Sequence, residues 1–266
     1  MISSDVFAVL ERGAISLFRL PRLEESEPSL SSICKLALPS LRSRTRYTHC
    51  SFHNYCAERL SGSTRTPVGY QRLPFSSDWK QGIVYLLLSL STETLRMPHY
   101  SLILSRKALS TIAEAELTAN LSTRTDAVPW NEWGPRSSRL FADPVVHVPI
   151  SCVGQRWILQ GNLNYRMLVV RDFNVFRARR LHSKIVEGTA QVNGGSDAEY
   201  EQHTIRVRVG PSTSMESNEF FVEDIVSELP FWETELGPYP DDLFEVVTDG
   251  EQLIGFVHMP VVSSLL

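Results

Sequence analysis

The chain has 266 residues, enough for one large all-β domain or two ordinary domains whose core needs no metal or disulfide to hold it. Hydrophobic residues make up 42% of the chain and charged residues 21%, which excludes the composition of a disordered protein. The formal net charge of -4 provides no long-range attraction to phosphate backbones or anionic lipid. Nucleic acid and membrane surfaces are therefore poor default partners.

Strand-like alternation and short turns dominate the predicted elements. Residues 5–10 and 14–20 flank the turn Glu11-Arg12-Gly13 and predict a hairpin. Further strands are predicted at 32–38, 48–57, 83–90, 100–104 and 204–209. At the end, 243–247 and 252–257 surround Asp249-Gly250, the pair best suited to a tight hairpin turn.

One helix is predicted, over 105–117. Its apolar residues fall near one helical face, and Ser105 stands where an N-cap is expected. We expect no second long helix, because helical periodicity is not evident elsewhere.

Many short strands and few helices predict a mainly β fold of antiparallel strands, as in a sandwich or a propeller. About a dozen strands, at four per blade, make roughly three blades, fewer than the four to eight of a closed ring. We therefore expect a single propeller-like domain over 1–266, with a ring that need not be complete and with one short helix.

The N-terminal residues and the cysteines indicate a cytoplasmic or nuclear protein. No basic stretch followed by an apolar run opens the chain, so we predict no signal peptide, and the longest apolar run, 83–90, is too short to span a bilayer. Four cysteines without framework spacing are most simply reduced thiols: Cys34, Cys50, Cys56 and Cys152.

Four short motif segments follow one another in the second half of the chain. They are Pro129-Trp130-Asn131-Glu132-Trp133-Gly134-Pro135, Gly154-Gln155-Arg156, Asp172-Phe173-Asn174 and Ser227-Glu228-Leu229-Pro230. With the closing Gln252-Leu253-Ile254-Gly255, their order resembles the C-terminal region of F-box proteins from mushroom-forming fungi. The first segment is the most specific, because two tryptophans, a Gly-Pro and the following Arg139 rarely occur at that spacing.

This resemblance implies a β-rich, propeller-like module that holds an unidentified protein target for a ubiquitin ligase, with cullin ligase subunits as further partners. Members of that family carry near the N-terminus an F-box helix of the Leu-Pro-x-Glu-Leu type, and residues 1–60 contain no such segment. We therefore expect the recognition module without its F-box and N-terminal blades. Ligase recruitment is left open.

Trp130 and Trp133 are the first candidate binding residues. They would form an aromatic recognition surface, or they would pin a long Pro-bounded loop onto the core. The second role is the commoner one for large aromatic residues in such a segment.

Arg139 and Arg156 are the second pair of candidates. They would recognise a carboxylate or phosphate of a partner, or they would fasten loops through bonds to Glu132 or Asp172. The segment that contains Asp172 and Asn174 is typical of a strand-ending turn, in which both side chains bond to nearby backbone groups. We assign it no catalytic role.

An enzyme is the alternative, carried by 49–56. On a helix, His49, His53 and Cys56 would share a face and ligate zinc for a metal-dependent hydrolase. The surrounding sequence favours a strand, which sends the histidines to one side and Cys50 and Cys56 to the other. We therefore assign no catalytic residue, no metal ligand and no cofactor.

A basic stretch with interleaved aromatic residues would suit RNA or an acidic peptide. Its members are Arg171, Phe173, Phe176, Arg177, Arg179, Arg180, His182 and Lys184. The net acidic charge of the chain argues against RNA. The leading hypothesis is a noncatalytic protein-interaction module; a hydrolase, or a truncated protein without independent function, are the alternatives.

Overall fold

The computed structural model describes residues 1–21, 29–53, 79–92, 98–119, 126–142, 148–160, 167–186, 205–215, 220–236, 243–248 and 253–257. They form two compact units. Unit 1 comprises the described residues within Met1–Asn54, Arg72–Val145 and Arg208–Pro230, and unit 2 those within Val146–Val207 and Phe231–Leu266. The single domain over 1–266 stays a prediction.

Unit 1 is built on two antiparallel sheets and a two-stranded ribbon among its described residues. The first sheet has the order β1 (Val6–Glu11), β2 (Ala14–Arg19) and β3 (Ser31–Ala37). The second has the order β4 (Arg46–His53), β5 (Ile83–Ser91), β6 (His99–Ser105) and β7 (Ser138–Phe141), and η1 (Trp79–Gln81) precedes β5. The ribbon pairs β12 (Ser212–Met215) with β13 (Ile225–Ser227).

The predicted N-terminal hairpin is confirmed by the pairing of β1 with β2. The turn between them contains Gly13, whose φ of 76° lies in the region that glycine adopts without the cost of a Cβ. Ile15, Leu17 and Leu36 have no exposed surface and form part of the unit 1 core. The predicted strands at 32–38, 83–90 and 100–104 are confirmed as β3, β5 and β6.

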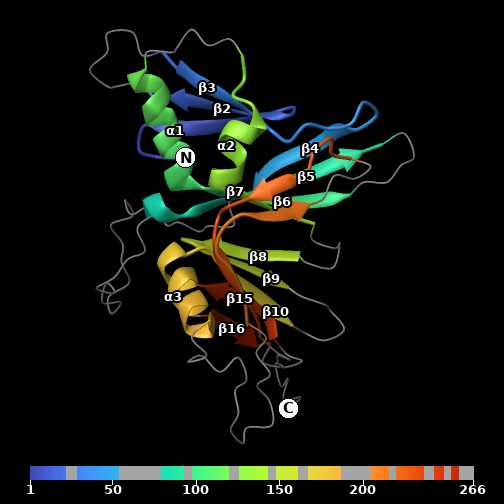
Figure 1. Cartoon of the computed structure of the whole chain (residues 1–266). Helices are drawn as coiled ribbons and strands as arrows, with labels where there is room; N and C mark the ends of the chain where they lie inside the picture. The colour runs from blue at the N-terminus through green and yellow to red at the C-terminus, as the bar shows by residue number, and fades with distance from the viewer. Residues whose placement is uncertain are drawn as a thin grey trace, which may run out of the picture. The chain divides into compact units, whose positions relative to one another are not determined.

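The predicted helix is confirmed as α1 (Arg106–Thr118). The Ser105 hydroxyl accepts a hydrogen bond from the Ala108 N–H at 3.3 Å, which satisfies one of the unpaired donors at the start of the helix. Leu109 and Ala113 are fully buried on the face that meets the core. In Figure 1, α1 and α2 (Trp130–Ser137) lie beside the β1–β3 sheet.

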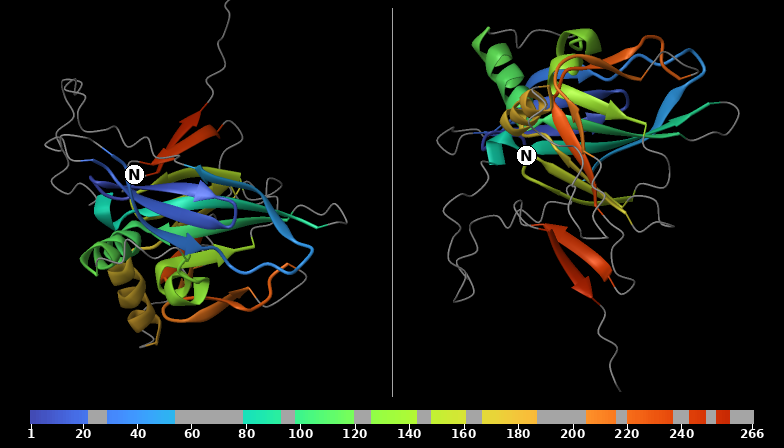
Figure 2. Two further views of the ribbon diagram at one scale, coloured as in Figure 1. Left: turned by 90° about the horizontal axis from the view of Figure 1, so that it is seen from above. Right: turned by 60° about the horizontal axis from the view of Figure 1, so that its bottom comes forward.

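Unit 2 contains a five-stranded sheet with the order β11 (Ile205–Arg208), β14 (Phe231–Leu236), β10 (Leu168–Asp172), β9 (Arg156–Gln160) and β8 (Val148–Val153). The helix α3 (Val175–Val186) follows β10 and contacts β14. The predicted terminal hairpin is confirmed by the pairing of β15 (Leu243–Thr248) with β16 (Leu253–Val257), the red ribbon of Figure 2. The turn residues Asp249 and Gly250 lie outside the described residues.

The mainly β, antiparallel fold is therefore confirmed, but the prediction of one short helix is wrong, because α2 and α3 also form. In α2, Gly134 and Pro135 lower helix propensity, and tertiary packing of the tryptophans overrides them. In α3, Ala178 is buried and Leu181 and Ile185 are half-buried, so helical periodicity was present beneath the conspicuous basic residues.

Candidate functional site

Trp133 fastens α2 to the β1–β3 sheet. Its side chain is 3% exposed, and its indole N–H donates at 2.8 Å to the carbonyl of Ala37, the last residue of β3. The Trp130 ring meets the Trp133 ring edge-on, with 5.0 Å between the centroids. These contacts give Trp133 a pinning role, the second of the two roles expected for it.

Gly134 is required by the position of the Trp130 ring. The two residues are one helical turn apart, and a Cβ at residue 134 would overlap the six-membered ring of Trp130. Trp130 is half-buried and packs against the unit 1 core, while its Nε1 is enclosed without a hydrogen-bond partner among the described residues. The tryptophans and the glycine of the first motif segment thus form one packed group.

Arg139 is a buried cation that connects β7 to the last motif segment. Its side chain donates to the Leu229 carbonyl at 2.7 Å, to the Ser212 hydroxyl at 2.8 Å and to the Ser227 carbonyl at 3.1 Å. Burial, and secondarily the charge of Arg208, lower the pKa of Arg139 to about 10. The fixed fork of guanidinium donors suits three acceptors on two segments of the chain, the last motif segment and β12.

The first and last motif segments also meet through the backbone. The Glu228 N–H donates to the Pro135 carbonyl at 2.7 Å. Together with the Arg139 bonds, this contact holds the end of α2, β7 and the residues after β13 as one structural block within unit 1. Arg139 therefore has the fastening role, with backbone and hydroxyl partners that lie far away in the sequence.

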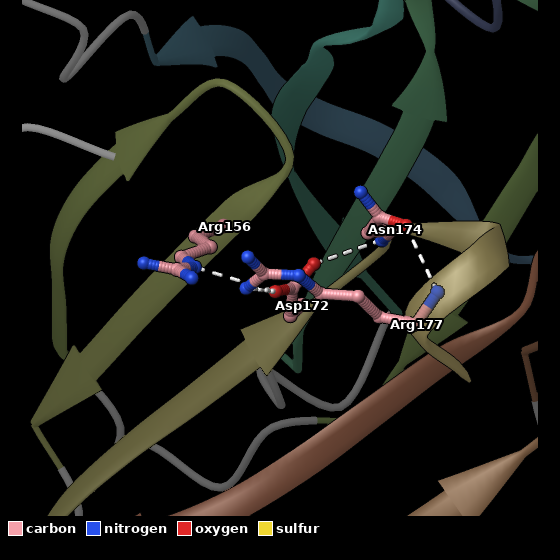
Figure 3. A network of polar contacts seen from close by, with 4 residues as sticks. All are labelled: Arg156, Asp172, Asn174 and Arg177. Carbon is pink, nitrogen blue, oxygen red and sulfur yellow. Dashed lines mark hydrogen bonds and ion pairs between the residues drawn. The ribbon is translucent and has the colours of Figure 1, made fainter. Parts of the chain in front are cut away.

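The second and third motif segments meet in unit 2 around Asp172, which Figure 3 shows in detail. The Asp172 carboxylate lies 3.3 Å from Arg156 Nε and 3.7 Å from Arg177 Nη1, and it also accepts the Asn174 N–H at 2.8 Å. The predicted Arg156–Asp172 contact is confirmed. The buried carboxylate is compensated by two cations and a backbone donor, as a buried charge requires.

Asn174 begins α3. Its side-chain oxygen accepts the Arg177 N–H at 3.0 Å, and its carbonyl accepts the Ala178 N–H at 2.9 Å. The predicted side-chain-to-backbone turn is confirmed, and it is at the same time a helix N-cap. The Phe173 N–H bonds to the Gln155 carbonyl at 2.8 Å, so the turn between β8 and β9 supports the same point.

The basic stretch consists of two groups: buried residues that precede α3 and exposed residues on α3 itself. Arg171 points inward: it pairs with Glu233 at 2.6 Å, and its guanidinium lies 4.9 Å from the centroid of the Trp157 ring. Phe173 is buried against Phe231. The outward residues are Phe176, Arg177, Arg179, Arg180, His182 and Lys184, and all are exposed.

The four predicted candidates are thus distributed over both units. Trp130 and Trp133 touch each other in unit 1, Arg139 is bonded elsewhere in the same unit, and Arg156 belongs to unit 2. Their role in recognition stays a prediction, whereas their contacts within the fold are direct. The exposed surface of α3 was present in the sequence as a basic stretch, but without the helix it had no defined face.

The segment considered for zinc is a strand, as predicted, up to the end of β4 at His53. Burial raises the pKa of the Cys50 thiol to about 11, which opposes the thiolate form that binds metals. Cys56 lies outside the described residues. Among the residues that the structure describes, no group of three or more His, Cys, Asp and Glu side chains is placed to hold a metal ion.

Comparison of the chain with protein-family models, curated proteins and solved structures finds no match. Across the described part of the chain, no helix has the length and apolar character needed to cross a membrane.

Proposed function

We propose that the chain is a noncatalytic protein-interaction module that presents α3 to a protein target. The observation that carries this proposal is Phe176, whose side chain is 84% exposed on a helix that is anchored on its opposite face. Ala178, on the inner face of α3, is fully buried, and Asn174 caps the first turn of the helix. Phe176 is therefore exposed on a fixed element.

An exposed phenylalanine has an energetic consequence. Burial of such a side chain is worth about 1.5–3 kcal/mol, which the isolated chain does not gain at Phe176. Single exposed apolar residues are common on protein surfaces. Phe176, however, is a large aromatic residue with arginines around it on an anchored helix, and aromatic residues and arginine are both enriched in protein interfaces.

The motif segments support the proposal as parts of the scaffold. The Asp172 network and the Asn174 cap hold the start of α3, and the Trp133 and Arg139 contacts hold α2 and β7. A scaffold of this kind is consistent with the proposed similarity to the recognition region of F-box proteins from mushroom-forming fungi. One antiparallel sheet has four strands in the consecutive order β4-β5-β6-β7, and a propeller blade is likewise a four-stranded sheet. This similarity favours the propeller-like arrangement.

Under this proposal, binding of the target does not depend on a ubiquitin ligase. The partner is a protein target in the cytoplasm or nucleus, and cullin ligase subunits would join it only where a recruitment site for them exists.

The proposal is tested by affinity purification of the tagged chain from its native cells, followed by mass spectrometry. We expect a specific partner with the native chain that is lost with Phe176→Ala. The matched control is Leu30→Ala, which removes an apolar side chain that is 60% exposed in unit 1. Equal recovery with Phe176→Ala and the native chain, or no specific partner at all, would contradict the proposal.

A further inference from the structure

The outward surface of α3 has a defined layout, and we call its residues Phe176, Arg177, Arg179, Arg180, Ser183 and Lys184 the α3 face. Phe176, Arg180 and Lys184 are spaced by four residues, so they form one line along the helix. Arg177 flanks this line on one side, and Arg179 and Ser183 flank it on the other. From Phe176 to Lys184 the line is about 12 Å long, at 1.5 Å per residue.

We propose that the α3 face binds an acidic segment of the target protein, with an apolar side chain of that segment against Phe176 and its carboxylates beside Arg179 and Arg180. This inference rests on the proposed function and names the chemistry of its partner.

The charge of the helix supports an acidic partner. The described sequence of α3 contains no acidic residue, and two exposed arginines stand close to Phe176: Arg180 on the line that begins there and Arg179 beside that line. Arg177 is already shared with Asp172 at 3.7 Å, although its side chain is 55% exposed. Guanidinium groups bind carboxylates through paired hydrogen bonds, so carboxylates are the chemistry that this surface recognises best.

The layout of aromatic residues favours a protein segment over nucleic acid. Single strands bind to surfaces on which successive bases stack on several aromatic rings. The α3 face offers one ring, Phe176, because Phe173 is buried against Phe231 with 5.8 Å between the ring centroids.

The length of the line limits the segment. An extended peptide advances about 3.3 Å per residue, so roughly four or five residues cover the distance from Phe176 to Lys184. Arg179 and Arg180 lie three and four residues after Phe176, so the shortest segment that contacts the ring and both arginines has one apolar residue with acidic residues on one side of it. Acidic residues on both sides allow the segment to bind in either direction.

The test uses the full chain and an array of short synthetic peptides. Each peptide has a central Phe, Leu, Ile or Met, flanked on both sides by Asp and Glu, by Lys and Arg, or by Ser and Gly. A labelled single-stranded RNA of mixed sequence is included as a separate probe. Affinities of the peptides that bind are then measured by fluorescence anisotropy at low and high salt.

We expect binding to the acidic peptides alone, with affinity that falls as salt rises. Phe176→Ala and the double change Arg179→Glu with Arg180→Glu should each weaken it by about tenfold or more. The matched control is Arg12→Glu with Lys107→Glu, which makes the same change of charge at exposed positions of unit 1 and should leave the affinity unchanged. If circular dichroism shows that the charge-reversal variant does not fold, Arg179→Gln with Arg180→Gln is used in its place.

The inference is overturned if the array shows no preference for acidic flanks, if the α3 variants bind the acidic peptides like the native chain, or if RNA is bound in preference to every peptide. Purification from cells separates this failure from that of the proposed function. A partner that is lost with Phe176→Ala but retained with the Arg179 and Arg180 changes would overturn the acidic chemistry alone, whereas loss with both changes supports it.

Discussion

Replacement of Arg139 by methionine should destabilise unit 1 strongly. The substitution keeps an unbranched side chain and removes the donors to the carbonyls of Leu229 and Ser227 and to the Ser212 hydroxyl. A hydrogen bond from a charged donor contributes about 1.5–3 kcal/mol net, and a buried acceptor that is left unpaired costs about 1–3 kcal/mol. Relief from burying the guanidinium offsets part of this, so we expect a loss of about 3 kcal/mol in the free energy of unfolding.

The assay is urea unfolding followed by circular dichroism and tryptophan fluorescence, with the transition midpoint and slope fitted for each variant. Arg206→Met is the matched control, because Arg206 is 63% exposed and reaches Glu233 and Glu235 only at 3.4 Å and 3.5 Å. Such an exposed pair contributes below about 1 kcal/mol, so the control should unfold nearly like the native chain. An Arg139→Met loss no larger than that of Arg206→Met would refute the fastening role.

Three further predictions concern single side chains. Trp133→Phe should lower the free energy of unfolding by at least about 1 kcal/mol more than Trp130→Phe, because only Trp133 donates its N–H to a carbonyl, that of Ala37; equal losses in urea unfolding would count against this bond. Gly134→Ala should destabilise the chain by about 1–3 kcal/mol, although alanine favours helices, because its Cβ overlaps the Trp130 ring; a raised melting temperature would contradict the packing. Burial raises the pKa of the Cys50 thiol from 9.0 to about 11, so the pH dependence of its alkylation rate in the folded chain should have its midpoint near pH 11. The stability that the thiol form contributes should be complete below pH 9 and should be lost as the pH rises through the folded-state pKa. A midpoint near pH 9 for Cys50, measured by mass spectrometry, would disprove this.

Local patterns predicted the elements whose stability is local. The β1–β2 hairpin, α1 with its Ser105 cap and the β15–β16 hairpin each combine periodicity with a turn or a cap. The turn at Asp172 and Asn174 was also predictable, because both side chains bond to backbone groups within three residues.

Other features depend on contacts between distant residues. α2 contains Gly134 and Pro135, and its place is fixed by the bond from Trp133 to Ala37, 96 residues away. The acceptors of Arg139 lie 73 to 90 residues further along the chain. A single sequence predicts that such an arginine needs partners, but it does not identify them. α3 was missed for another reason: six conspicuous outward residues masked the periodicity of the buried side.

Photo-crosslinking in native cells tests whether α3 presents a recognition surface. A photoreactive phenylalanine analogue is placed at Phe176, and in a second strain at Leu30, which is exposed in unit 1. If α3 binds the target, we expect a specific crosslinked protein from position 176 and not from position 30. No specific crosslink at position 176, or the same products from both positions, would contradict the claim that α3 presents a recognition surface.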